Sequence, residues 1–182
     1  RLKIKYKNII LGRIFSSGQY YPFVLAECLF KNRKNYKILV DHHIKSGCKN
    51  VYPDILVIKN DKAIAVIEVK LDLGWFDIKN DIRKLARNYK LSREITYKIG
   101  DGKTERIAVN NKLRKIFFVV TKANDHDRYS YTSKQLENAG FGVVHCLEKP
   151  HHLNRKDFKI DYIKTDLKKN SKLILKSFNW LK

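Results

Sequence analysis

The chain has 182 residues, of which 43% are apolar and 12% aromatic, so we expect one compact domain with a real core and exclude general disorder. Lys and Arg number 39 against 18 Asp and Glu, and the net charge of +21 indicates a polyanionic partner, either nucleic acid or an anionic membrane surface. No apolar run reaches about 18 residues, which excludes a membrane-spanning helix.

The first half of the chain predicts one helix followed by three strands. Residues 1–17 alternate basic and apolar side chains and are expected to form an arm or an edge strand. A Ser and a Gly, followed by an apolar stretch with Pro22 in its first turn, predict a helix from Ser17 onward. Apolar runs separated by turn residues then predict a meander of strands at 36–43, 54–59 and 63–70.

The second half predicts a helix, a hairpin, a strand, a helix and a strand. Apolar residues at helical spacing from Ile78 to Tyr89 predict a helix over residues 74–92. Alternation with period two around Asp101-Gly102 predicts a hairpin over residues 94–110. The remaining predicted elements are a buried strand at 114–122, a short helix at 131–140 and a strand at 141–149.

The order of these elements predicts the fold class. The central strands are apolar on both faces, so helices are expected to cover both sides of the sheet. We therefore expect an α/β or α+β fold with a mixed sheet. No linker rich in Gly, Pro or Ser divides the chain, which favours a single domain over residues 1–182. The Lys-rich residues 149–182 form a basic extension that we expect to close with an amphipathic helix at 173–182.

Two carboxylates interrupt the central apolar strands. If residues 60–62 form a three-residue loop, Lys59 pairs with Ala63, and counting back along the ladder sets Asp54 opposite Glu68. Directly opposed residues project to the same face with Cβ atoms about 5 Å apart. The two carboxylates are therefore expected to meet at one end of the hairpin.

Lys70 is expected to join Asp54 and Glu68, because strand side chains repeat every two residues. Two carboxylates at this distance repel each other, and a divalent cation between them would remove the conflict. Oxygen ligands without Cys or paired His favour Mg²⁺ or Mn²⁺. The Lys70 ammonium would then orient a water, help its deprotonation or stabilise charge on phosphorus, which fits a phosphodiester substrate.

The motif formed by PD at 53–54 and EVK at 68–70 resembles that of the PD-(D/E)xK nuclease superfamily, which has the restriction-endonuclease-like fold. Its predicted order of helix, three strands, helix and strand also agrees with the family core, so the resemblance covers about residues 18–148. It implies that a cation is held by the side chains of Asp54 and Glu68, the Val69 carbonyl and Glu27 on the preceding helix, and that Lys70 serves the nucleophilic water.

The resulting functional hypothesis is a Mg²⁺-dependent or Mn²⁺-dependent DNA endonuclease that hydrolyses phosphodiester bonds with a metal-activated water. Two alternatives stay open: a non-catalytic basic module that binds nucleic acid, and a nuclease of the same fold that acts on RNA. DNA is the expected partner, no membrane is expected, and a homodimer is a further alternative because many relatives dimerise to cut both strands.

Several of these residues also have ordinary structural interpretations. Asp54 could merely begin a strand, and Glu68 with Lys70 could be a solvated edge pair. Glu27 could form an i, i+4 helix pair with Lys31. Asp41-His42-His43 is similar to the motif of the DHH phosphoesterases, but that family needs an earlier Asp-x-Asp, and no Asp precedes residue 41.

Basic residues on the predicted second helix suggest how the substrate is held. Opposite its apolar stripe lies a row at helical spacing that suits phosphates: Lys79, Arg83, Arg87 and Lys90. The predicted hairpin carries Lys103 near its tip and could enter a groove. The alternative in both places is a solvated surface.

The cysteine content and the start of the chain bear on location. The three cysteines are scattered, with no spacing typical of zinc or of a disulfide framework, and no apolar signal segment opens the chain. We therefore expect a reducing, cytoplasmic location. The chain starts at Arg1 and contains no Met, so we expect it to be trimmed or processed.

Overall fold

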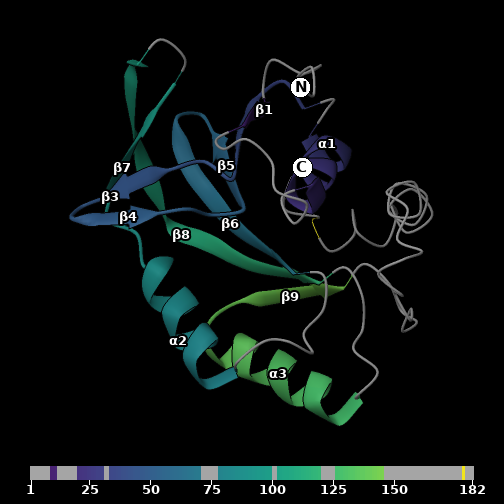
Figure 1. The fold of residues 1–182 in the computed structure, drawn as a ribbon. Helices are drawn as coiled ribbons and strands as arrows, with labels where there is room; N and C mark the ends of the chain where they lie inside the picture. Colours follow the sequence, from purple (N-terminus) through teal and green to yellow (C-terminus); the bar gives the residue numbers. More distant parts are fainter. Residues whose placement is uncertain are drawn as a thin grey trace.

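The computed structural model is an α+β fold built on one open, mixed and mostly antiparallel sheet (Figure 1). The structure describes residues 9–11, 20–30, 33–70, 78–99, 102–119, 126–145 and Phe178. The helices in these ranges are α1 (Tyr20–Phe30), α2 (Ile78–Asn88) and α3 (His126–Asn138). The strands are β1 (Ile9–Leu11), β2 (Tyr36–Val40), β3 (Ile44–Ser46), β4 (Lys49–Val51), β5 (Ile55–Lys59), β6 (Lys62–Lys70), β7 (Glu94–Lys98), β8 (Thr104–Val119) and β9 (Gly142–His145).

The centre of the sheet combines a meander with two parallel additions. Strands β2, β5 and β6 pair antiparallel in sequence order, as predicted. Strand β8 then pairs parallel with β6, and β9 pairs parallel with β8. Parallel neighbours need long crossover connections, and the segments that contain α2 and α3 provide them. The predicted α+β class and the mixed sheet are therefore confirmed.

Strand β8 is longer than predicted. The hairpin around Gly102, whose φ is +75°, forms as expected, but its return strand continues into the predicted strand at 114–122 as one element of 16 residues. Its first part pairs with β7, and its last part lies between β6 and β9. The polar residues between these parts lie where the register with β6 shifts, and here the Asn110 side chain accepts a hydrogen bond of 2.8 Å from the Lys112 N–H.

The strand predicted at 36–43 ends early, at Val40. Asp41 has a φ of +44°, a left-handed conformation that short polar side chains tolerate best, so the chain leaves the sheet direction here. A hairpin made of β3 and β4 follows around Gly47 (φ +60°) and was not predicted. It reaches the far side of the sheet, where β3 pairs with β7, before β5 returns to the centre (Figure 1).

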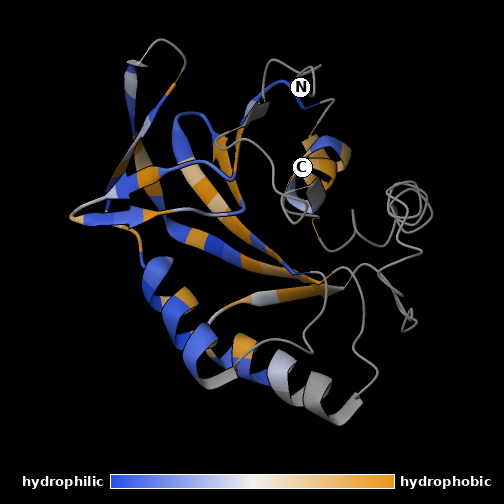
Figure 2. Ribbon diagram, in the orientation of Figure 1, coloured by the Kyte–Doolittle hydropathy of each residue, from blue (hydrophilic) through white to orange (hydrophobic). Residues whose placement is uncertain are grey.

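The core has two layers, one on each face of the sheet. Alternate residues of β5, Ile55 and Val57, pack in one layer with α1, while Leu56 and Ile58 pack in the other with α2 and Phe141, which follows α3. Helix α1 is apolar over most of its length, whereas α2 is largely polar with a narrow apolar stripe (Figure 2). Both faces of the central strands are thus buried, as the sequence predicted.

The helix boundaries differ from the predicted ones by a few residues. Helix α1 is described over Tyr20–Phe30, and the predicted start at Ser17 lies outside the described residues, whereas α3 begins at His126, five residues earlier than predicted. The predicted C-terminal helix lies outside the described residues, apart from the buried Phe178, whose ring centroid is 6.5 Å from that of Phe118. None of the helices described is both long and apolar enough to cross a bilayer.

Candidate metal and phosphodiester site

The β5–β6 hairpin sets the register of the site. Its turn has two residues instead of the predicted three: Asn60 and Asp61 have φ values of +50° and +55°, as a type I′ turn requires, and Lys59 pairs with Lys62. A bulge between Val57 and Ile58 then shifts the ladder by one residue, so that Ile55 pairs with Ile67. The paired ladder ends there, so Asp54 and Glu68 are the next residues on the two strands. The predicted three-residue loop was wrong, but Ile55 and Ile67 still pair in the predicted register because the bulge compensates for the shorter turn.

Asp54 is partly buried at the start of β5. Its Oδ2 accepts a 2.7 Å hydrogen bond from the N–H of Val69 on β6. Burial and the neighbouring Glu68 carboxylate raise the pKa of Asp54 from 3.8 to about 7, against the opposing effects of the Val69 N–H and Lys70. The two carboxylates therefore lie close enough to interact electrostatically.

Both oxygens of the Glu68 carboxylate have partners. Oε1 forms an ion pair of 2.7 Å with the Nζ of Lys70, and Oε2 accepts a hydrogen bond from the hydroxyl of Tyr89, which follows α2. Glu68 is only 8% exposed, so these partners replace much of the water that its charge would otherwise bind. Burial and the Glu68 carboxylate raise the pKa of Tyr89, which remains a phenol.

Lys70 keeps its proton in this environment. Burial disfavours its charged form, but the negative charges of Glu68, Asp54 and Asp81 together outweigh that effect, so its pKa lies above the usual value. The ammonium is therefore a fixed positive charge beside the two carboxylates. In the present arrangement it acts as an ion-pair partner, and no neutral amine is available to accept a proton.

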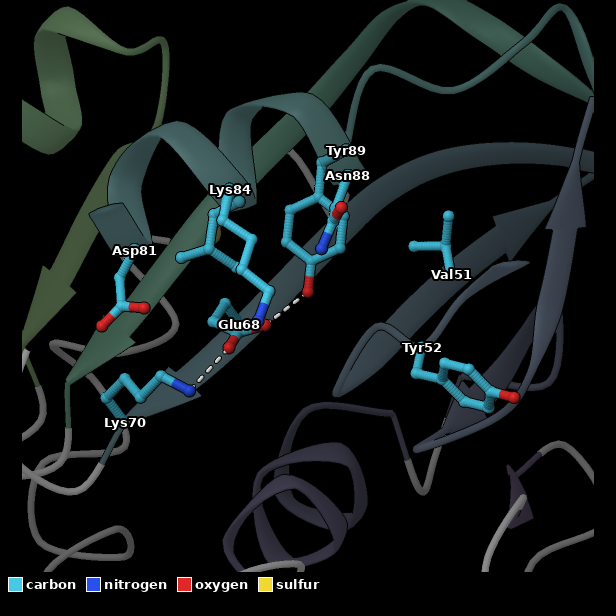
Figure 3. A pocket seen from close by; sticks show the side chains of 9 residues that line it. Val51, Tyr52, Glu68, Lys70, Asp81, Lys84, Asn88 and Tyr89 are labelled. Carbon is cyan, nitrogen blue, oxygen red and sulfur yellow. Dashed lines mark hydrogen bonds and ion pairs between the residues drawn. The ribbon is translucent and has the colours of Figure 1, made fainter. Parts of the chain in front are cut away.

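Glu68, Lys70 and Tyr89 line a cleft of about 230 Å³ between α2, the end of β6 and the segment that follows β4, whereas Asp54 is not among its lining residues (Figure 3). Helix α2 contributes residues at the spacing of one helix face: Asp81, Lys84, Leu85 and Asn88. In Figure 3 the side chains of Lys84 and Lys70 both point toward Glu68. Two ammonium groups thus flank one buried carboxylate, an arrangement able to attract an anion into the cleft.

Helix α1 does not bring Glu27 into this group. The apolar side of α1 packs on the sheet face that carries Ile67 and Val69, whereas Glu68 belongs to the opposite face with Val66. Within the described ranges, no group of three or more His, Cys, Asp and Glu side chains could hold a metal ion. Glu27 is half-buried, and its role as a ligand stays a prediction.

The basic residues named from the sequence lie outside the cleft. Arg83 and Arg87 are exposed and line a separate open hollow on α2, and Lys90 lines another hollow beyond the end of this helix. Lys103 is exposed beside the hairpin turn, and the side chain of Lys79 lies outside the described residues. Their role in binding nucleic acid stays a prediction.

Two residues of the cleft were missed by sequence reasoning. Tyr89 was interpreted only as part of the apolar stripe of α2, although a phenol at the end of such a stripe can also donate a hydrogen bond. Lys84 is not part of the row of cations predicted opposite the apolar stripe. Its i+3 spacing from Asp81 and i−4 spacing from Asn88 would have placed it on the face that lines the cleft.

Comparisons of the chain with protein-family models, with curated proteins and with solved structures found no match. What the site can do therefore rests on its own chemistry. Two neighbouring carboxylates, a main-chain segment beside them and flanking ammonium groups form a site that could bind a hard cation together with an anionic substrate.

Proposed function

We propose that this protein is a metal-dependent DNA endonuclease that hydrolyses phosphodiester bonds at the cleft around Glu68. The observation that carries the proposal is the cluster at the end of the β5–β6 ladder, where Asp54 contacts the N–H of Val69 and the Lys70 ammonium lies 2.7 Å from Glu68. This is the arrangement expected from the PD-(D/E)xK motif. The meander followed by two parallel strands with intervening helices also supports a restriction-endonuclease-like fold.

The donor set fits Mg²⁺ or Mn²⁺. Asp54 and Glu68 supply carboxylate oxygens. Burial, and after it the Glu68 charge, raises the pKa of Asp54, and a cation beside the two groups would favour the ionised carboxylate. In an extended strand the N–H and C=O of one residue point to the same side, so the Val69 carbonyl is directed toward Asp54, which its N–H already contacts. When bound, the cation supplies Lewis acidity, which polarises the phosphate and lowers the pKa of water.

The remaining ligands expected of Mg²⁺ are waters and substrate oxygens, so two carboxylates and one carbonyl are a sufficient protein contribution. Lys70, once released from Glu68, is positioned to stabilise negative charge on the scissile phosphate. Lys84 points into the same cleft and adds positive charge on the side of α2 (Figure 3). The net charge of +21 favours a phosphodiester backbone as the anion.

The decisive experiment incubates the full chain with supercoiled plasmid, linear duplex, single-stranded and branched DNA in Mg²⁺, in Mn²⁺ or in EDTA. We expect cleavage of at least one substrate with either cation and none in EDTA. Glu68→Gln is expected to abolish cleavage while DNA binding in EDTA persists. Undiminished cleavage in EDTA would rule out the metal site.

Two outcomes would favour the alternatives. If the protein binds DNA but cleaves no substrate in the presence of either cation, the result would indicate a non-catalytic basic module. Cleavage restricted to RNA in a parallel series would indicate a nuclease of the same fold with a different substrate. Sedimentation analysis of the active protein with and without DNA would test the homodimer that many relatives of the family form.

A further inference from the structure

An exposed aromatic side chain lies at the edge of the proposed active cleft. Tyr52 has 45% of its surface exposed and is the large hydrophobic residue that the described part of the chain leaves in contact with solvent. It lines the same cleft as Glu68 and Lys70. Tyr52 also precedes Asp54 by only two residues, with the buried Pro53 between them, so its backbone is tied closely to the carboxylate pair.

The Tyr52 ring is supported by a second ring. The centroid of His43 lies 4.9 Å from that of Tyr52, with an angle of 31° between the ring planes, which is a tilted aromatic pair. The Nε2 of His43 also lies 2.9 Å from the Oδ1 of Asn50 on β4. The segments before and after the β3–β4 hairpin thus bring two rings together, which we name the Tyr52–His43 platform.

The hydroxyl group of Tyr52 is oriented away from the carboxylates of the site. In Figure 3 its ring lies across the cleft from Lys70, and its hydroxyl points away from Glu68. The hydroxyl therefore does not serve the carboxylates as that of Tyr89 does. What Tyr52 offers at the cleft is apolar ring surface, in a cleft that the ammonium groups of Lys70 and Lys84 also line.

We propose that the Tyr52–His43 platform stacks one unpaired nucleobase of the substrate, so that the cleft takes DNA with a single-stranded segment next to the scissile phosphate. The inference rests on the proposed nuclease function and adds the substrate class. Aromatic surface beside a cationic groove is the usual means of holding single-stranded nucleic acid, because every base has a π-face. Bases within an intact duplex are stacked on each other and leave no face for the platform.

The test uses the full chain in EDTA, where binding is measured without cleavage. The probes carry 2-aminopurine and comprise a single-stranded oligonucleotide, a duplex with a single-stranded flap, a duplex with one mismatched pair and a blunt duplex. We expect fluorescence quenching for the probes with an accessible unpaired base. Tyr52→Leu should reduce the ratio of flap to blunt-duplex affinity about 10-fold or more, and Tyr52→Phe should retain it.

Lys45→Ala provides the matched control on the same hairpin, because it removes an exposed charge and leaves both rings in place. It should weaken flap and blunt duplex by the same factor, which rises at low salt. If Tyr52→Leu folds, still cleaves DNA and keeps the same preference for the flap over the blunt duplex, the platform is overturned and the nuclease proposal is unaffected. Quenching that depends on Tyr52, in a protein that cleaves no DNA in the presence of Mg²⁺ or Mn²⁺, would support the platform and overturn the nuclease proposal. Absence of any DNA binding would overturn both.

Discussion

Asp54→Asn should stabilise the metal-free protein, and the gain should grow with pH. In the folded state the pKa of Asp54 is raised from 3.8 to about 7 by burial and by Glu68. Between these two values the folded protein retains a proton that the unfolded chain has released. The free energy of unfolding therefore falls as pH rises through this window and levels off above pH 7.

The magnitude follows from the width of that window. Each pKa unit corresponds to about 1.4 kcal/mol, so the full difference from 3.8 to about 7 is worth ~4 kcal/mol. Only the part between pH 5 and pH 7 is accessible to a practical titration, and it amounts to ~3 kcal/mol. Asn carries no charge at any pH, and its side-chain oxygen can still accept the hydrogen bond from the Val69 N–H.

The assay is urea unfolding of both proteins in EDTA at several pH values from 5 to 8. The other titrating groups of this strongly basic chain are common to both proteins, so the difference in unfolding free energy isolates Asp54. It should increase by ~3 kcal/mol across the series, whereas Glu137→Gln, which removes an exposed carboxylate on α3, should show no such rise. A difference that stays constant between pH 5 and pH 8 would mean that Asp54 is ionised throughout and would refute the electrostatic account of the site.

Three further predictions concern the neighbours of Glu68. Tyr89→Phe removes a buried hydrogen bond to a charged group, so urea denaturation should show a loss of roughly 1.5–3 kcal/mol; an unchanged midpoint would mean that this bond contributes nothing. Lys84→Ala should lower turnover at least 10-fold because Lys84 lines the cleft. Arg83→Ala, one residue away and outside the cleft, should lower only the affinity for DNA. Equal losses of turnover in the two variants would show that position in the cleft is irrelevant. Lys70→Ala should keep calorimetric Mg²⁺ binding and lose about 100-fold or more in cleavage rate, an expectation that wild-type turnover would contradict.

The sequence predicted the centre of the sheet well because its signals there are local. Continuous apolar runs identified β5 and β6, and the two-residue alternation put Lys70 on the face of Glu68. The bulge next to Ile58 leaves no comparable trace in the sequence, since it depends on how the ladder closes after a tight turn. Ile55 and Ile67, the neighbours of Asp54 and Glu68, pair in the predicted register only because the shorter turn and the bulge offset each other.

The contacts that the sequence did not predict join distant parts of the chain. Tyr89 and Glu68 are separated by 21 residues, and helical periodicity says only that Tyr89 faces the core. The β3–β4 hairpin was not evident in a short polar stretch, yet it places Tyr52 at the cleft with His43 beside it. Patterns within one element therefore found the carboxylates, whereas the groups that surround them required the tertiary structure.

The metal-free site is organised so that each charge is compensated by the chain itself. Glu68 is neutralised by Lys70 and hydrogen-bonded by Tyr89, and Asp54 keeps its proton up to about pH 7. For both carboxylates to become ligands, Asp54 must release that proton and Lys70 must leave Oε1 of Glu68. The first change becomes easier as pH rises, and the second frees an ammonium inside a cleft where a phosphate would bind. Lys70, which neutralises Glu68 in the metal-free protein, is thus also the residue that the proposed reaction needs beside the phosphate.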